Sequence, residues 1–115
     1  FDIEIKPHSI VVADRGYCDY GLLNHWDSNN VFYVGRHKDN IRYRTIEELP
    51  LPKQHTQNVL MDESIEFGLP AAKEKFPKRL KRIAVWNDEH GFVIELLTNN
   101  FTLAASTIAK LYKAR

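Results

Sequence analysis

A short apolar run near the start of the chain constrains the fold more than any other feature. The letters IVVA follow Ser9 without polar alternation, and Asp14 comes directly after them. Such a run is typical of a strand buried on both faces of a parallel sheet, here predicted from Ser9 to Ala13. An aspartate at the carboxyl end of such a strand lies where open α/β sheets place ligand-binding groups. Alternatively, Asp14 only opens a turn, and Gly16 supplies the backbone freedom.

The residues that follow extend this strand into a strand, helix, strand unit. A helix is predicted from about Asp19 to Ser28, and its apolar residues at helical spacing are Leu22, Leu23 and Trp26. A second continuous apolar run, from Val31 to Val34, ends before Gly35. Two buried strands joined by one helix predict a βαβ unit with adjacent parallel strands and a right-handed crossover.

Beyond Arg36 the sequence becomes richer in charged residues and proline. Pro50 and Pro52 interrupt regular structure there. Three later segments carry the residue types of strands: Val59 to Phe67, Arg79 to Trp86, and Phe92 to Leu97. The turn residues between the last two segments predict a β-hairpin. We therefore expect residues of about 41 to 91 to form a mostly β insertion within an α/β core.

The last segment of the chain has the pattern of an amphipathic helix. This helix is predicted from about Leu103 to Arg115, and Thr102 is the expected N-cap. Its apolar stripe consists of Leu103, Ile108, Leu111 and Tyr112. The fold class predicted from the whole pattern is α/β.

Length and composition limit the class of protein. A chain of 115 residues with 43% hydrophobic residues supports one modest core and has no room for two independent domains. Its longest apolar runs are four residues, far short of the roughly 20 that cross a bilayer, and no segment resembles a signal peptide. Cys18 is the only cysteine, so an internal disulfide is excluded. These features predict a cytoplasmic protein without membrane contact.

Positive charge is concentrated in the second half of the chain. Residues 69–115 carry 9 Lys and Arg against 4 Asp and Glu, whereas residues 1–68 carry 7 against 11. The densest part is a basic cluster formed by Lys73, Lys75, Lys78, Arg79, Lys81 and Arg82. Such a cluster either contacts the phosphates of DNA or forms a solvated face of the protein.

Two segments of the chain resemble motifs of one enzyme family. DRGYCDYGLL, after the first apolar run, resembles the second-aspartate motif of insertion-sequence transposases of the DDE type. LTNNFTLAASTIAKLYKAR resembles the strand, loop and helix that carry the family's Y-x2-R-x3-E signature, with Tyr112 and Arg115 in its first two positions. The resemblance covers nearly the whole chain. It implies a partial ribonuclease H-like core, made of the βαβ unit and the last helix, with the mostly β insertion between them.

The resemblance also implies a chemistry for Asp14. In the family, three carboxylates gather two divalent cations, usually Mg²⁺, which activate a water or a 3′-hydroxyl and stabilise the leaving oxygen of a phosphodiester. Asp14 would be one catalytic, metal-binding carboxylate. The first aspartate would lie upstream of Phe1 and the glutamate just past Arg115. The resemblance thus implies a fragment, inactive alone, of a transposase that acts as a homodimer on transposon ends and target DNA.

Other residues acquire DNA-binding roles through the same resemblance. Arg15, Tyr112 and Arg115 could hold phosphates near the cleavage point, because the planar fork of arginine pairs two phosphate oxygens. For Tyr112, core packing is the alternative. Trp86 could stack on a flipped base, or it could only pack the hairpin. In the basic cluster, the expected phosphate contacts are Lys78, Arg79, Lys81 and Arg82.

Two other functions remain open. Asp14, Arg15 and Gly16 also resemble the acidic, glycine-containing turn of nucleotide-binding methyltransferases. Only Gly16 precedes Gly21, however, so the tight turns that bring backbone against a cofactor are not supplied. The third possibility is a DNA-binding remnant of a mobile element that has no catalytic activity. A glutamate a few residues after Arg115 and an upstream aspartate would favour the transposase.

Overall fold

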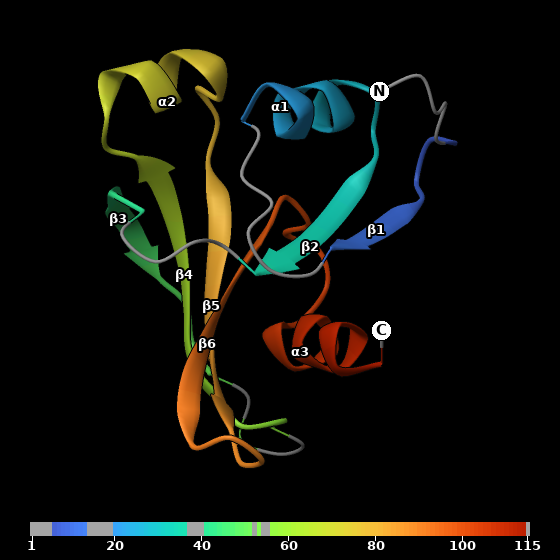
Figure 1. Cartoon of the computed structure of the whole chain (residues 1–115), viewed down its shortest axis with the longest axis vertical. Coiled ribbons are helices and arrows are strands. Elements are labelled where there is room, and N and C mark those ends of the chain that lie inside the picture. The colour runs from blue at the N-terminus through green and yellow to red at the C-terminus, as the bar shows by residue number, and fades with distance from the viewer. Residues whose placement is uncertain (1–5, 14–19, 37–40, 52, 54–55, 115) are drawn as a thin grey trace.

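A single mixed sheet of six strands organises the part of the chain that the computed structural model describes, which is residues 6–13, 20–36, 41–51, 53 and 56–114 (Figure 1). The strands are β1 (Ile10–Ala13), β2 (Phe32–Arg36), β3 (Tyr43–Glu48), β4 (Val59–Phe67), β5 (Leu80–Asn87) and β6 (Phe92–Thr98). Their order across the sheet is β1-β2-β6-β5-β4-β3. The helices of the same residues are α1 (Tyr20–Ser28), α2 (Pro70–Lys75) and α3 (Ala105–Lys113). The structure therefore has the mixed α/β class predicted from the sequence.

The first strand, helix, strand unit forms as expected. β1 and β2 pair in parallel, with a register that runs from Ile10 beside Phe32 to Ala13 beside Gly35. α1 connects them and buries Leu23 and Trp26. The two parallel strands and the helix predicted from the apolar runs are confirmed. The expectation that the first strand is buried on both faces is wrong, because β1 is at the edge of the sheet, where Ile10 is 40% exposed.

The later strands continue the same sheet rather than forming a separate one. β6 pairs antiparallel with β2 on one side and with β5 on the other, and β4 and β3 follow outward from β5. The strands predicted from Val59, Arg79 and Phe92 are confirmed as β4, β5 and β6 within one or two residues. At the β5–β6 turn, Gly91 has a φ of +70°, a conformation that glycine adopts without steric cost.

Two elements were not predicted. β3 is an edge strand whose residues are exposed or only half-buried, so it lacks the apolar signal of the inner strands. α2 has six residues and begins with Pro70 in its first turn, where the fixed φ of proline suits a helix. A helix this short carries too few turns for an apolar period to be visible in the sequence.

The start of the last helix differs from the prediction. α3 begins at Ala105, its N-cap is Ala104, and no side chain caps it. The expected cap at Thr102 is wrong, because the backbone N–H groups of Thr102 and Leu103 both donate to Asn100 Oδ1 at 2.9 Å. These bonds hold the chain in a loop past residue 103, so the helix starts two residues later than expected.

The helices cover different parts of the sheet. One apolar cluster joins α1 and α2 to the sheet through residues such as Trp26, Tyr33 and Phe67. A second cluster joins α3 to the sheet through residues such as Val34 and Ile108. Because successive residues of a strand point to opposite faces, Tyr33 and Val34 of β2 belong to different clusters. Within the described part of the chain, no helix is long and apolar enough to cross a membrane.

Candidate functional site

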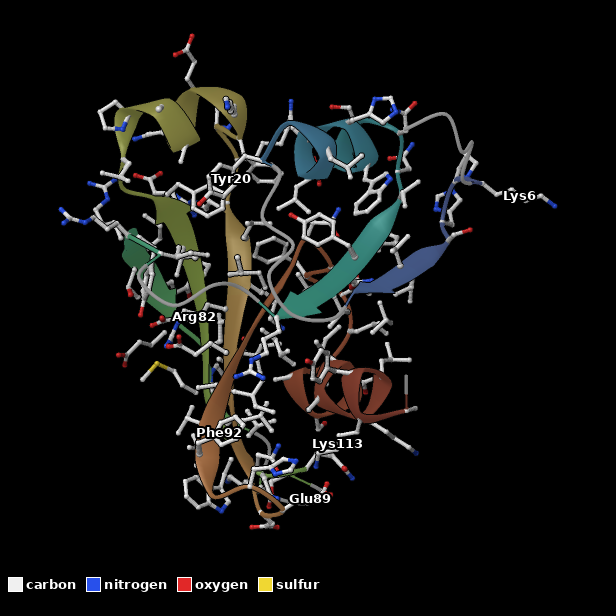
Figure 2. All side chains as sticks on the ribbon, viewed as in Figure 1. Lys6, Tyr20, Arg82, Glu89, Phe92 and Lys113 are labelled. Atoms are coloured by element: carbon white, nitrogen blue, oxygen red, sulfur yellow. The ribbon has the colours of Figure 1, made fainter. Side chains whose placement is uncertain are left out.

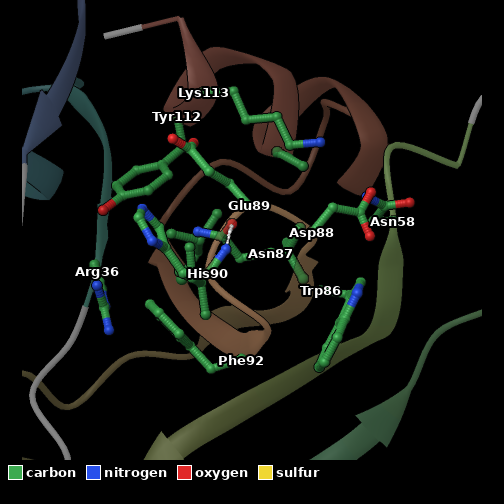
Figure 3. A pocket seen from close by; sticks show the side chains of 14 residues that line it. Arg36, Asn58, Trp86, Asn87, Asp88, Glu89, His90, Phe92, Tyr112 and Lys113 are labelled. Carbon is green, nitrogen blue, oxygen red and sulfur yellow. Dashed lines mark hydrogen bonds between the residues drawn. The ribbon is translucent and has the colours of Figure 1, made fainter.

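A cleft of about 650 Å³ lies between the carboxyl end of β2, the β5–β6 hairpin and the last turn of α3 (Figure 3). The side chains on which its chemistry depends come from all three of these elements and from the loop before β4: Arg36, Asn58, Trp86, His90, Phe92, Tyr112 and Lys113. Figure 2 shows Phe92, Glu89 and Lys113 at one end of the molecule. We refer to this site below as the cleft.

The strand that leads to Asp14 ends beside the cleft. Ala13, the last residue of β1, pairs with Gly35 of β2. The next residue of β2, Arg36, lines the cleft. Asp14 and Arg15 themselves lie outside the described residues, so their predicted roles remain predictions.

One wall of the cleft combines a cation with two aromatic rings. The guanidinium carbon of Arg36 lies 5.3 Å from the centroid of the Phe92 ring. The ring of His90 stacks on the same Phe92 ring, with 5.8 Å between the two ring centroids. Guanidinium groups and aromatic rings are the groups that proteins use to contact phosphates and nucleobases. None of these three residues was predicted from the sequence as a site residue, although Phe92 was recognised as the start of a strand.

The turn that carries His90 is held by polar side chains. The backbone N–H of His90 donates to Asn87 Oδ1 at 3.1 Å. The side-chain amide of Asn58, before β4, donates to Asp88 Oδ2 at 2.9 Å. The turn is therefore tied to a second segment of the chain, which limits its freedom to move.

The signature helix brings Tyr112 to the same cleft. Tyr112 is 3% exposed and packs in the apolar cluster beneath α3, so core packing and a place in the cleft wall are both observed. Lys113 also lines the cleft, and its ammonium group donates to the backbone oxygen of Gln57 at 3.3 Å. Figure 3 shows Tyr112 on the side of the cleft toward Arg36. Arg115 lies outside the described residues.

Trp86 borders the cleft but belongs to the other face of the sheet. It pairs with Val93, and it is 38% exposed. Its neighbour Val85 packs in the cluster under α3. Because residues alternate along a strand, the side chain of Trp86 points away from that cluster. His90 and Phe92 are thus the aromatic pair that the hairpin contributes to the cleft.

The basic cluster separates into exposed and buried residues. Lys78 and Arg79 are exposed, and the ammonium group of Lys78 lies 2.7 Å from Asp27 Oδ2. Lys81 and Arg82 are 3% and 7% exposed. These four were the expected phosphate contacts. Only Lys78 and Arg79 reach solvent without rearrangement of the sheet.

Carboxylates neutralise the buried pair. The ammonium group of Lys81 lies 3.3 Å from Asp62 Oδ2. Arg82 pairs with Glu63 at 3.0 Å and also with Glu95. In Figure 2, Arg82 lies over the strands rather than at the rim of the molecule. A DNA phosphate could reach either cation only by displacing a buried carboxylate, which would itself be left without its counter-charge.

Burial perturbs one of these carboxyl groups. Removal of Asp62 from water raises the pKa of its carboxyl group, and the nearby charge and hydrogen bond of Lys81 oppose that rise. Among the described residues, His, Cys, Asp and Glu side chains form no group of three or more that could hold a metal ion. The polar lining of the cleft combines the cations Arg36 and Lys113 and the amides of Asn58 and Asn87 with the carboxylates of Asp88 and Glu89.

Comparison with known proteins assigns the chain to a family. Residues 3–115 match the family described as "Transposase DDE domain". The transposase-named protein y4zB of Sinorhizobium fredii is 29% identical over 115 residues, which cover 98% of this chain and 32% of that protein. A protein of Geobacillus stearothermophilus, named as a transposase for insertion sequence element IS5377, is 27% identical over 110 residues, or 96% of this chain and 28% of that protein.

This chain spans about a third of the length of these curated relatives. No solved structure matches it at a significant level. The family match covers almost every residue, and both motifs recognised in the sequence lie within it. The chain belongs to the transposase DDE domain family.

Proposed function

We propose that these residues form the central part of the catalytic domain of a DNA transposase, which cleaves and joins DNA strands at transposon ends by two-metal phosphodiester chemistry. The observation that supports the proposal most strongly is the convergence of the two family motifs. The strand that precedes Asp14 and the helix that carries Tyr112 are far apart in sequence, yet α3 packs against both β1 and β2. The strand before the first motif and the helix of the second therefore both lie beside the end of the sheet where the cleft lies.

The architecture is compatible with a ribonuclease H-like core. In this proposal the core consists of β1, α1, β2 and α3, and residues of about 41 to 91 are a β-rich insertion whose strands extend the sheet. β1 is an edge strand of the described sheet, so its outer side is available to pair with a further strand of a longer protein. Such a strand could bring the first aspartate of the motif to the same sheet edge.

The motif residues and Arg36 take distinct roles in the proposed reaction. Asp14 is a catalytic carboxylate and a ligand of Mg²⁺, which would activate the attacking oxygen and stabilise the leaving oxygen of the phosphodiester. Arg15, Tyr112 and Arg115 hold phosphates near the cut. Arg36 joins this set, because it follows the β2 residue that pairs with the last residue of β1. The parent enzyme acts as a homodimer on DNA.

The aromatic contact with an unstacked base is proposed for His90 as well as for Trp86. Both border the cleft, but His90 stacks on Phe92 on the α3 side, whereas Trp86 lies on the opposite face of β5. Aromatic rings bind bases of any sequence, because every base offers a flat face for stacking.

Cleavage is the direct test of the proposal. A full-length transposase that contains these residues should nick DNA at the ends of its element when Mg²⁺ is supplied, and chelation of the metal should stop the reaction. The 115-residue chain alone should not cut, because the resemblance assigns only one of the three carboxylates to it. A full-length protein that bound its transposon ends with Mg²⁺ present and left them intact would contradict the proposed activity.

The exposed part of the basic cluster gives a second test. Lys78 and Arg79 lie at the start of β5, and the cleft lies at its other end, so these residues would contact DNA flanking the cut. Replacing both by alanine should lower the slope of log affinity against log salt by up to about 2, since each phosphate contact contributes roughly 0.9. Duplex binding by the 115-residue chain, measured by fluorescence anisotropy across a salt series, provides the slopes.

The matched control removes two positive charges elsewhere. Arg42 and Arg44 are exposed at the edge strand β3, and replacing both by alanine changes the net charge equally. This variant should keep the slope of the unmodified chain. If all three proteins gave the same slope, Lys78 and Arg79 would be solvated residues that do not contact DNA. The cleft would then be the remaining proposed DNA contact.

A further inference from the structure

The helix that completes the cleft has no side-chain cap at its own start. Ala104 is the N-cap of α3, and its methyl group cannot accept a hydrogen bond from the first turn. The loop before it is nevertheless fixed by hydrogen bonds. Asn100 Oδ1 accepts from the backbone N–H groups of Thr102 and Leu103, each at 2.9 Å. The N–H of Asn100 in turn donates to Thr98 Oγ1, at the end of β6, at 3.1 Å.

A buried lysine ties this loop to the sheet. The ammonium group of Lys81 donates to the backbone oxygen of Leu103 at 3.3 Å. The same group pairs with Asp62 of β4, and both side chains are less than a tenth exposed. Lys81 also pairs with Thr98 in the register of β5 and β6. Lysine is almost never buried unless it has a specific partner, so a specific role for this one is expected.

Together these groups connect three strands to one loop. We define the α3 anchor as Asp62, Lys81, Thr98 and Asn100. Of these, Thr98 is 0% and Asn100 is 6% exposed, so the anchor lies inside the protein. Its hydrogen bonds converge on residues 100–103, directly before the helix.

The anchor supplies the directional contacts that apolar packing lacks. α3 buries Ile108 and Ala109 against the sheet, but hydrophobic burial depends on area and not on direction. Packing alone therefore permits small shifts of the helix along its axis. A displacement at Ala105 would be carried along a nine-residue helix to Tyr112 and Lys113, which line the cleft. Reactions of this kind are sensitive to misplacement on the scale of about 1 Å.

We propose that Lys81 and Asn100 are positioning residues, which hold α3 in place so that the residues of its last turn meet the DNA in the cleft correctly. Neither residue contacts the substrate. This inference rests on the proposed transposase function for its catalytic consequence, although the anchoring of α3 can be measured without it. It also gives Lys81 a role that does not require it to reach a DNA phosphate.

Hydrogen exchange on the 115-residue chain tests the anchoring. Asn100→Ala removes the acceptor of two hydrogen bonds and should raise the exchange rates of α3 amides about tenfold or more, with those of β4 and β5 unchanged. Asn100→Asp keeps an acceptor oxygen at the same place and should restore protection. The control is Thr102→Ala, in the same loop, whose side chain was the cap expected from the sequence. Unchanged α3 protection in Asn100→Ala would overturn the anchor.

Cleavage by the full-length protein tests the positioning role. Asn100→Ala should lower kcat about tenfold or more and leave KM for the transposon end within twofold, and Asn100→Asp should cleave almost normally. A kcat unchanged while α3 is loosened would overturn the role. If Asn100→Ala does not fold, Lys81→Arg can replace it in the same comparison. This variant keeps a positive charge facing Asp62 but moves the N–H donors away from the backbone oxygen of Leu103. A wild-type protein without cleavage activity would refute the proposed function. The hydrogen-exchange measurement would still show whether the anchor holds α3 in place.

Discussion

A full-length transposase with asparagine in place of Asp14 should lose strand cleavage while it binds transposon ends with nearly unchanged affinity. The amide is close in size to the carboxylate but lacks its negative charge, so it should hold Mg²⁺ poorly and remove the metal-dependent step. A loss of at least a thousandfold in rate is expected, which corresponds to about 4 kcal/mol of transition-state stabilisation. Single-turnover cleavage of end-labelled DNA measures the rate, and gel shift in Ca²⁺ measures binding.

Asp88, a carboxylate that lines the cleft, provides the control. Asp88 lies in the β5–β6 turn and accepts a hydrogen bond from Asn58, so Asp88→Asn makes the same chemical change without touching the proposed metal site. It should cleave at close to the normal rate. Polar substitutions at strand ends usually change the free energy of unfolding by less than about 0.5 kcal/mol, so both variants should fold. Normal cleavage by Asp14→Asn would return Asp14 to the role of a turn residue.

The largest change in stability is expected at Arg82. Its guanidinium pairs with Glu63 at 3.0 Å, and the Glu63 side chain is only 4% exposed. Glu63 also accepts a hydrogen bond from the hydroxyl of Thr45 on β3. Arg82→Met would leave this carboxylate buried without its counter-charge. The free energy of unfolding should fall by about 3–5 kcal/mol, measured by urea denaturation of the 115-residue chain.

The double variant separates an ion-pair effect from a packing effect. Arg82→Met combined with Glu63→Leu removes both charges and should recover most of the lost stability, because a well-packed apolar pair can replace a buried ion pair. Glu95, the other partner of Arg82, is a third exposed and can remain hydrated. Arg79→Met, one residue before β5, alters an exposed arginine and should change stability by less than about 0.5 kcal/mol. A mild effect of Arg82→Met alone would mean that water already reaches Glu63.

Local sequence signals were sufficient for the parallel unit and the inner strands. The run before Asp14 and the run from Val31 form adjacent parallel strands, as the lack of polar alternation predicted, although β1 is an edge strand and Ile10 in it is exposed. β3 was not predicted because an edge strand that carries charged residues has no apolar pattern in the sequence. The cap at Thr102 was mispredicted because the competing acceptor, Asn100, is recognisable only once the loop geometry is known.

The basic cluster shows why charge in a sequence does not map directly onto a surface. Lys81 and Arg82 are neighbours in β5, so they point to opposite faces of the sheet. Each finds a carboxylate on β4, where Asp62 and Glu63 are also neighbours. The sequence does contain a signal for these buried contacts. Two consecutive acidic residues lie in one predicted strand, and two consecutive basic residues lie in the next.

The cleft depends on contacts between distant parts of the chain. Arg36 meets Phe92 because β6 pairs with β2, and no local pattern in either strand indicates that pairing. Tyr112 and Arg115 were found through the family signature, and Trp86 through the aromatic that the resembled family uses in this region. Resemblance therefore identified the motif residues, whereas the cation and the aromatic pair opposite them required the three-dimensional arrangement.

The position of β6 has a consequence for the order in which the chain can acquire its structure during synthesis. β6 lies between β2 and β5, so it is the seam that joins the parallel pair to the three strands β3, β4 and β5. Those two halves emerge from the ribosome first and have no direct strand pairing with each other. Assembly of the sheet must wait for residues 92–98, and such non-local pairing is intrinsically slow. A nascent chain that ends before residue 98 would hold two unjoined half-sheets with exposed apolar faces, a state that invites aggregation.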